Sequence, residues 1–155
     1  MELEFKPVVA GDIDRLRPFY GLRPNKTCDS VFLDSFLWKD YYHVQCAVSE
    51  GRAVLWLMEK DGQVSTAMPL CREEDLPYFF QQMVDYFSGV LHKPFYISLA
   101  DEEAVQCLNL DPALFEVEEQ VDLKDYLYSG EELRKLEGKK FVKKRNHLNG
   151  FKRTY

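Results

Sequence analysis

The stretch Val44-Gln-Cys-Ala-Val-Ser-Glu-Gly-Arg-Ala-Val-Leu-Trp-Leu-Met-Glu-Lys-Asp-Gly-Gln-Val-Ser-Thr-Ala-Met-Pro-Leu70 decides the fold. Its first residues follow a period of two, which is typical of a strand, and Glu50-Gly51 turns the chain. The apolar run 53–58 has the composition of a central strand. Asp61-Gly62 accepts the positive φ of a type I′ turn, so a hairpin follows. The stretch therefore predicts three antiparallel strands.

Helices are predicted on both sides of this meander. Asp12 is placed to cap a helix through Tyr20 that Pro18 distorts. Ser30 is placed to cap a second helix, and Asp75 a long third one with Pro77 in its first turn. Each of the last two carries an apolar stripe that we expect to be buried: Leu33, Phe36, Leu37 and Tyr41 in one, and Leu76, Phe80, Met83, Val84, Phe87 and Leu91 in the other.

Beyond the long helix, strands are expected over 95–99 and within 115–123, with a short helix capped by Asp101 between them. Ser129 and Glu132 form a capping box, which predicts that the last helical region starts there. Gly138 is expected to break it before a second helical piece. The predicted class is α/β, more closely α+β: a mixed central sheet with an antiparallel meander flanked by helices. This order matches the GNAT-type acyl-CoA N-acyltransferase fold.

Length and composition are those of one folded domain. The chain has 155 residues, of which 46% are apolar, so we expect a single domain over 1–155 with its own core. The longest apolar run, 53–58, is far below the roughly 18 residues of a membrane span. The acidic start Met1-Glu-Leu-Glu is followed by no apolar targeting segment, which favours the cytoplasm.

Charge is unevenly distributed along the chain. Residues 131–155 hold 9 Lys or Arg and 3 Asp or Glu, whereas the rest holds 11 basic and 23 acidic residues. Clustered cations focus an electrostatic field, so one interpretation is an anionic partner at this end. The other is a solvated helix face that docks on the acidic body.

Metal and cysteine chemistry are weakly indicated. The cysteines are 18, 25 and 36 residues apart, with no Cys-x-x-Cys pair, so buried thiols and no metal site are expected. His43 and Cys46 would point to opposite faces of a strand. A cysteine nucleophile with His92 or His147 as base has no specific signal. The cysteines are Cys28, Cys46, Cys71 and Cys107.

The basic terminal block is more informative. Placed on a helix, the apolar residues Phe141, Leu148, Phe151 and Tyr155 form one stripe, and Arg145 lies beside it. A guanidinium there needs an anion or several carbonyls. The neighbouring donors suit a phosphate of tRNA, a nucleotide or a lipid head group, while a buried structural ion pair is the alternative. The candidate phosphate-binding residues are Lys143, Lys144, Arg145, Asn146 and His147.

Catalytic and cofactor sites are not specified by the sequence. Pyrophosphate binding in a GNAT fold uses backbone N–H groups at a glycine-rich turn that opens a helix. The corresponding turn, 71–75, reads Cys-Arg-Glu-Glu-Asp, so no cofactor is expected and coenzyme A binding is disfavoured. Asp101-Glu102-Glu103 offers a general base, although acidic residues at a helix start are ordinary dipole partners. The catalytic residues stay unknown.

Two segments resemble a known family. Asp125-Tyr-Leu-Tyr-Ser-Gly-Glu-Glu-Leu-Arg-Lys-Leu-Glu-Gly-Lys-Lys-Phe-Val-Lys-Lys-Arg-Asn-His-Leu-Asn-Gly-Phe151 is similar to the signature of a domain also found as the C-terminal part of phosphatidylglycerol lysyltransferase, and Ser35-Phe-Leu-Trp38 resembles its N-terminal half. The resemblance implies GNAT-like domains, usually in tandem, some of which transfer an aminoacyl group from tRNA to a lipid head group. Asp125 and Tyr126 match the motif; packing of an extended segment is the alternative for Tyr126.

The expected function is that of an aminoacyl- or acyltransferase-like domain, which would use aminoacyl-tRNA or another phosphate-bearing ligand. The chain resembles the N-terminal half of the tandem, because it stops at Tyr155 inside a helical pattern, so a second GNAT-like domain is an expected partner. The alternative is a non-catalytic scaffold, or an RNA- or partner-binding half with a basic C-terminal helix.

Overall fold

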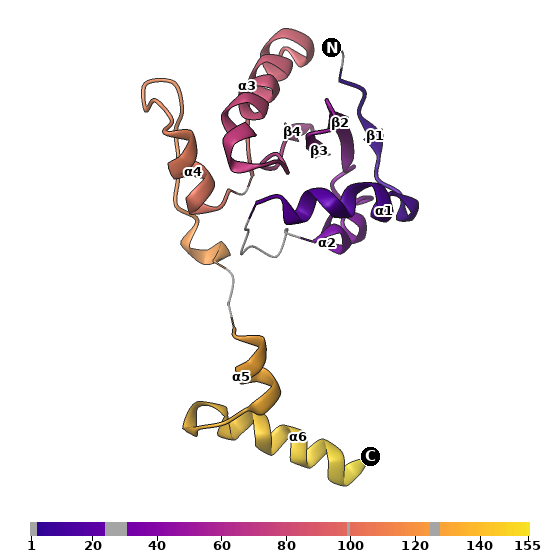
Figure 1. Ribbon diagram of the computed structural model, residues 1–155, viewed down its shortest axis with the longest axis vertical. Coiled ribbons are helices and arrows are strands. Elements are labelled where there is room, and N and C mark those ends of the chain that lie inside the picture. Colours follow the sequence, from indigo (N-terminus) through magenta and orange to yellow (C-terminus); the bar gives the residue numbers. More distant parts are fainter. Residues whose placement is uncertain (1–2, 24–30, 99, 125–127) are drawn as a thin grey trace. The chain divides into compact units, whose positions relative to one another are not determined.

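The computed structural model describes residues 3–23, 31–98, 100–124 and 128–155 (Figure 1). The chain groups into two compact units, unit 1 (Met1–Glu119) and unit 2 (Gln120–Tyr155), and each is described by itself. A single domain over 1–155 stays a prediction. The fold is α+β, with one four-stranded antiparallel sheet.

The sheet has the order β1 (Lys6–Pro7), β2 (Gln45–Ser49), β3 (Ala53–Lys60) and β4 (Gln63–Ser65), and all its neighbours are antiparallel. Both tight turns have the backbone that the sequence predicted. In the second one Asp61 and Gly62 have φ of 52° and 82°, the positive values of a type I′ turn. The predicted meander is confirmed.

The strands predicted after the long helix are not formed. Over 95–98 only one isolated parallel bridge, Thr66 to Ile97, reaches the sheet, and residue 99 lies outside the described residues. The prediction of a strand within 115–123 is wrong, since this stretch is irregular and ends in the 3-10 turn η5 (Val121–Leu123). Three glutamates at 116, 118 and 119 disfavour a place inside a sheet.

The N-terminal helices follow the sequence only in part. The distorted first helix comprises η1 (Ala10–Asp12), α1 (Ile13–Leu16) and η2 (Arg17–Gly21), with Pro18 at the start of η2. In α2 (Phe32–Leu37) the predicted stripe is wrong for Leu33, Leu37 and Tyr41, which are exposed. Its fourth member, Phe36, packs against the core beside the buried Phe32. The proposed cap Ser30 lies outside the described residues.

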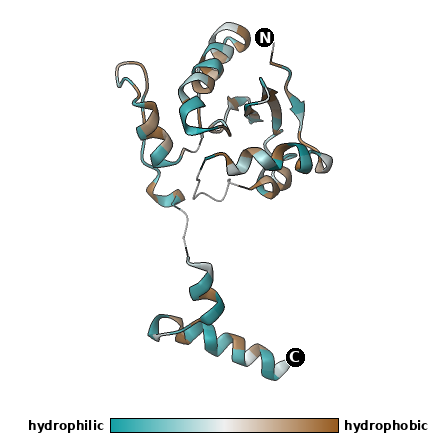
Figure 2. Ribbon diagram, viewed as in Figure 1, coloured by the Kyte–Doolittle hydropathy of each residue, from teal (hydrophilic) through white to brown (hydrophobic). Residues whose placement is uncertain are grey.

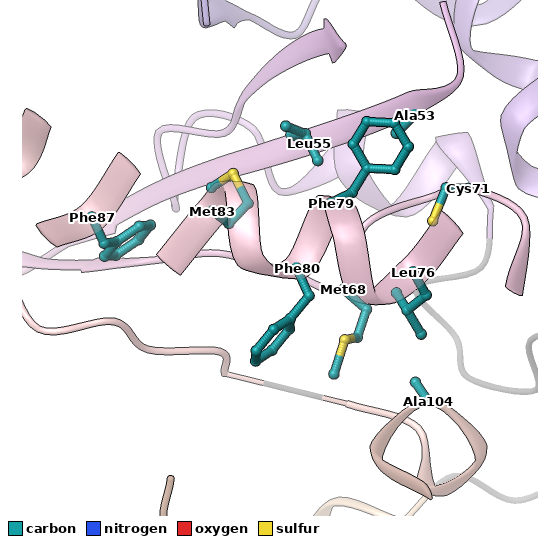
Figure 3. Packing of buried hydrophobic residues seen from close by; sticks show 10 residues of the cluster. All are labelled: Ala53, Leu55, Met68, Cys71, Leu76, Phe79, Phe80, Met83, Phe87 and Ala104. Carbon is teal, nitrogen blue, oxygen red and sulfur yellow. The ribbon is translucent and has the colours of Figure 1, made fainter. Parts of the chain in front are cut away.

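The long helix forms where it was predicted, but Asp75 makes no side-chain capping hydrogen bond. Of the predicted stripe, Val84 and Leu91 are only half-buried and the other four residues are buried, as is Phe79, which was not predicted. The long helix comprises the turn η3 (Glu73–Asp75), α3 (Leu76–Tyr86) and a π-helical turn, η4 (Phe87–Leu91), and it is followed by α4 (Glu102–Leu108). Figure 3 shows α3 packing its apolar side chains against β3. The cluster consists of Ala53, Leu55, Met68, Cys71, Leu76, Phe79, Phe80, Met83, Phe87 and Ala104.

Strand β3 is buried on both faces. Ala53 and Leu55 belong to the cluster with α3, whereas Val54 and Trp56 belong to a second cluster that includes Leu16 and Phe32. Because successive side chains of a strand point to opposite faces, this arrangement explains the uninterrupted apolar run 53–58. The sheet of unit 1 therefore has an apolar layer on each side.

Unit 2 consists of short helical pieces. After η5 come α5 (Gly130–Lys135), the 3-10 turn η6 (Lys139–Phe141) and α6 (Val142–Thr154). Apolar and polar residues alternate along α6 in Figure 2. Among the described helices of the chain, none has the length and apolar character that crossing a bilayer requires.

Candidate functional site

The basic terminal block lies on two helices of unit 2, α5 and α6, which are joined by a turn over residues 136–141; residues 130–154 are called here the hairpin. Ser129 caps α5, since its Oγ accepts a hydrogen bond from Glu132 N at 3.4 Å. The helix ends at Leu136 in the left-handed region, and Gly138 has φ of 85°, a conformation that favours glycine. Both predicted signals, the cap and the glycine break, are therefore confirmed.

Arg145 fixes the turn between α5 and α6. Its Nη1 donates to Gly138 O at 2.9 Å and also to Leu136 O. The sequence analysis expected either an anion or several carbonyls as partners of Arg145, and the structure has carbonyls. No carboxylate among the described residues forms an ion pair with Arg145. The guanidinium thus hydrogen-bonds two carbonyls of the turn that follows α5.

The five predicted phosphate-binding residues do not share one face. Consecutive residues of a helix are about 100° apart, so five of them encircle it. Lys144 lies on the side of the apolar stripe, and its Nζ is 5.7 Å from the centroid of the Tyr128 ring. The helical period places Lys143 and His147 to one side of that stripe, and Asn146 on the opposite face.

An open depression of about 450 Å³ lies along α6, lined by Asn146, Asn149, Lys152 and Arg153. Only Asn146 belongs to the predicted block. The other three, Asn149, Lys152 and Arg153, follow it by three, six and seven residues, so steps of three and four connect all four along one side of the helix. Sequence reasoning missed them because it considered consecutive residues, although this spacing was a signal for them.

Two cations before α6 are paired with carboxylates. Lys135 Nζ lies 2.7 Å from Glu131 Oε1, and Lys140 Nζ lies 2.8 Å from Glu132 Oε1. Within the described ranges, none of the cations of α6 forms an ion pair with a carboxylate; these cations are Lys143, Lys144, Arg145, Lys152 and Arg153. The positive charge of α6 is therefore not neutralised by carboxylates in the part that the structure describes.

The acidic candidate of unit 1, Asp101, is held in a buried ion pair. Arg23 donates from Nη1 at 3.0 Å and from Nη2 at 3.2 Å, and both side chains are more than 90% buried. Asp101 Oδ1 also accepts from Ala104 N at 2.9 Å, which caps α4. These contacts support the interpretation of Asp101 as a helix cap.

The turn over 71–75 keeps its acidic character. Arg52 pairs with Asp75, and its guanidinium carbon lies 5.4 Å from the centroid of the Phe79 ring. Pro77 near the start of α3 has no N–H to offer an anion. Burial raises the pKa of the Cys71 thiol to about 11, so it is protonated at neutral pH. The expectation that coenzyme A does not bind here stays a prediction.

The remaining candidates gain no support as a site. Arg15 Nη2 lies 3.7 Å from Cys46 Sγ, and burial is the main cause that raises the pKa of this thiol. Within the described ranges no three His, Cys, Asp or Glu side chains come together as metal ligands do. Asp125 and Tyr126 lie outside the described residues.

Comparison with known proteins identifies the family. The profile described as "Phosphatidylglycerol lysyltransferase, C-terminal" matches residues 21–155, which include strands β2 to β4, α3, α5 and α6 but not β1. The chain belongs to this family. The resemblance drawn from the two sequence segments is thereby confirmed, and the phosphatidylglycerol lysyltransferase C-terminal family supports a relation to transferases. No curated protein and no solved structure matches the chain.

Proposed function

We propose that this chain is an aminoacyl- or acyltransferase-like domain with a GNAT-like fold, and that α6 binds phosphate groups of aminoacyl-tRNA. Membership of the phosphatidylglycerol lysyltransferase C-terminal family supports the transferase part. In this proposal the domain acts in the cytoplasm beside a second GNAT-like domain.

The observation that carries the proposal is the set of cations on α6 that have no carboxylate partner within the described ranges. Nucleic acid binding gains most of its affinity from Lys and Arg side chains that neutralise phosphates. Cations already paired with carboxylates contribute less, because the pair must break first. The cations of α6 that have no carboxylate partner in the described part of the chain provide such a surface.

The residues of α6 have different roles in this proposal. Lys152 and Arg153, with the amides of Asn146 and Asn149, bind a phosphate at the depression. Lys143 and His147 contact a neighbouring phosphate from the next side of the helix. Arg145 is a positioning residue, since it is already bonded to the α5–α6 turn.

The test is the salt dependence of tRNA binding, measured by fluorescence anisotropy between about 50 and 200 mM salt. The double variant Lys152→Gln/Arg153→Gln is expected to bind more weakly at every salt concentration. Its plot of log affinity against log salt should be shallower by about 1.5, because two phosphate contacts are lost.

A matched control is available in the same unit. Lys135→Gln/Lys140→Gln removes the same charge, but it takes cations that are paired with Glu131 and Glu132. Its salt slope should stay close to that of the parent chain. An equal loss in both variants would show a nonspecific charge effect, and absence of tRNA binding by the parent would refute the phosphate-binding role.

A second candidate function is a non-catalytic half that binds RNA or a partner domain. The observation favouring it is that Asp101 is engaged in a buried ion pair and that the 71–75 turn is acidic. Coenzyme A is then expected to leave the melting temperature unchanged. A saturable rise in melting temperature with coenzyme A would favour the acyltransferase instead.

A further inference from the structure

A group of apolar side chains at α2 is left on the surface of unit 1. Phe32 belongs to the buried cluster that also contains Val54 and Trp56 of β3. The rest of α2 and its C-terminal turn carry apolar side chains on their outer side as well. A helix that is apolar on more than one face is normally covered. The exposed residues, called here the α2 platform, are Val31, Leu33, Leu37, Trp38, Tyr41 and Tyr42.

The aromatic part of the α2 platform is well fixed. The ring centroids of Tyr41 and Tyr42 are 4.7 Å apart, and that of Trp38 is 5.8 Å from Tyr41. Glu59 N on β3 donates to Tyr42 O at 2.8 Å, which ties the turn to the sheet. Rigid Trp and Tyr side chains with neighbouring leucines are typical of the centre of a protein interface.

The charges around the α2 platform select a cationic partner. Lys39 Nζ lies 5.8 Å from the Phe36 ring centroid and Lys60 Nζ 3.7 Å from that of Tyr41, so both ammonium groups are drawn onto rings. Their carboxylate partners Asp40 and Asp61 have side chains 90% and 87% exposed, against 27% and 36% for the lysines. The carboxylate is thus the more exposed member of each pair, which favours a basic partner over nucleic acid or anionic lipid.

Helix α6 has the complementary features. Leu148, Phe151 and Tyr155 are exposed along one side, with the Phe151 and Tyr155 rings 5.0 Å apart, and Lys144 lies on the same side. The units also differ in net charge: residues 120–155 hold 10 basic and 5 acidic residues, and residues 1–119 hold 10 and 21. The basic amphipathic helix α6 is therefore complementary in charge and polarity to the α2 platform.

We propose that the α2 platform of one copy of this chain binds α6 of a second copy. If each copy binds α6 of the other, the two contacts are equivalent and form a closed dimer with twofold symmetry. Both apolar surfaces of both copies are then buried. The phosphate-binding proposal uses cations on other sides of α6, so either inference stands without the other.

The test is the oligomeric state measured by sedimentation across protein concentration. The parent chain should form a dimer, and Leu37→Ser/Trp38→Ser and Phe151→Ser/Tyr155→Ser should each raise the dissociation constant about ten-fold or more. The matched control Val90→Ser/Leu114→Ser removes exposed apolar side chains outside both surfaces and should leave the dimer unchanged.

Several results would overturn the proposal. These are a parent chain that stays monomeric at every concentration, a dimer that persists in both test variants, and a control that dissociates equally. Binding of a monomeric parent to phosphatidylcholine vesicles, lost in Leu37→Ser/Trp38→Ser, would assign the α2 platform to a bilayer instead. Circular dichroism of each variant verifies that it is folded.

Discussion

Unit 1 buries apolar side chains on both faces of β3, whereas Phe141 is the single buried apolar residue among the described part of unit 2. The hairpin of unit 2 keeps its shape through polar contacts instead: a serine cap, a glycine turn, the Arg145 clamp and two ion pairs. Packing stabilises far more than surface ion pairs do. Unit 1 therefore has the contacts of a stable core, while most described side chains of unit 2 are exposed.

The largest expected difference concerns one phenylalanine in each unit. Phe79→Ala leaves a cavity between α3 and β3 and should lower the free energy of unfolding by about 4 kcal/mol. Phe151→Ala, on exposed α6, should cost the monomer less than about 0.5 kcal/mol, at protein concentrations too low for the proposed dimer. Urea unfolding of both variants measures this, and similar losses would show that α6 is packed as tightly as the core.

The buried ion pair of unit 1 gives the next effect. Asp101→Asn leaves the Arg23 charge without its partner and should cost about 3 kcal/mol. The double variant Arg23→Met/Asp101→Leu removes both charges and should recover part of this loss. A cost below about 1 kcal/mol for Asp101→Asn in urea unfolding would contradict the assignment of this pair as a structural element.

Cys71 should make the stability of unit 1 fall at alkaline pH. Its pKa is raised by burial from 9.0 to about 11, so between these values the unfolded chain releases a proton that the folded chain keeps. The contribution is fully present below pH 9 and is lost as pH rises, by up to about 1.4 kcal/mol per pH unit. The decrease in unfolding free energy from pH 8 to pH 10 should be smaller in Cys71→Ala; an unchanged decrease would contradict the role of Cys71.

The smallest expected effect is local to unit 2. Arg145→Met removes the hydrogen bonds to the turn and should destabilise the hairpin by about 1 kcal/mol, with faster amide exchange in α6. The control Arg153→Met removes a bond to Asn149 within the same helix and should change exchange less. Because Arg145 and its two carbonyl partners all lie within unit 2, the melting temperature of unit 1 should stay constant. A clear drop would refute the assignment of Arg145 as a contact local to unit 2.

The sequence predicted those parts of the fold that have local chemical signals. The meander followed from Asp61-Gly62 and the apolar run 53–58, and α3 followed from its period and Pro77. The face of α2 was wrong, because this helix is apolar on two sides and only tertiary packing decides which side enters the core. The strand within 115–123 was wrong, since alternation was outweighed by its glutamates.

The sequence located the candidate site in the correct helix, but it did not predict which residues of that helix lie together on one side. A run of cations identifies a basic helix, yet its period places Lys152 and Arg153, and not Lys144, beside Asn146. Arg145 was expected to contact either an anion or several carbonyls. It contacts carbonyls because α5 ends at Leu136, which brings the following turn within reach of the guanidinium. The exposed platform at α2 was not predicted, because three of its residues, Leu33, Leu37 and Tyr41, were assigned to the core.

Hydrogen exchange with and without tRNA tests most directly whether the surface of unit 2, and not the core of unit 1, forms the binding site. Protection of the α6 amides, Val142–Thr154, should rise about ten-fold or more on binding, because ligand contacts stabilise a helix that little packing supports. The amides of β2 and β3 should be unaffected. Protection that appears at the 71–75 turn instead, with α6 unchanged, would contradict the account.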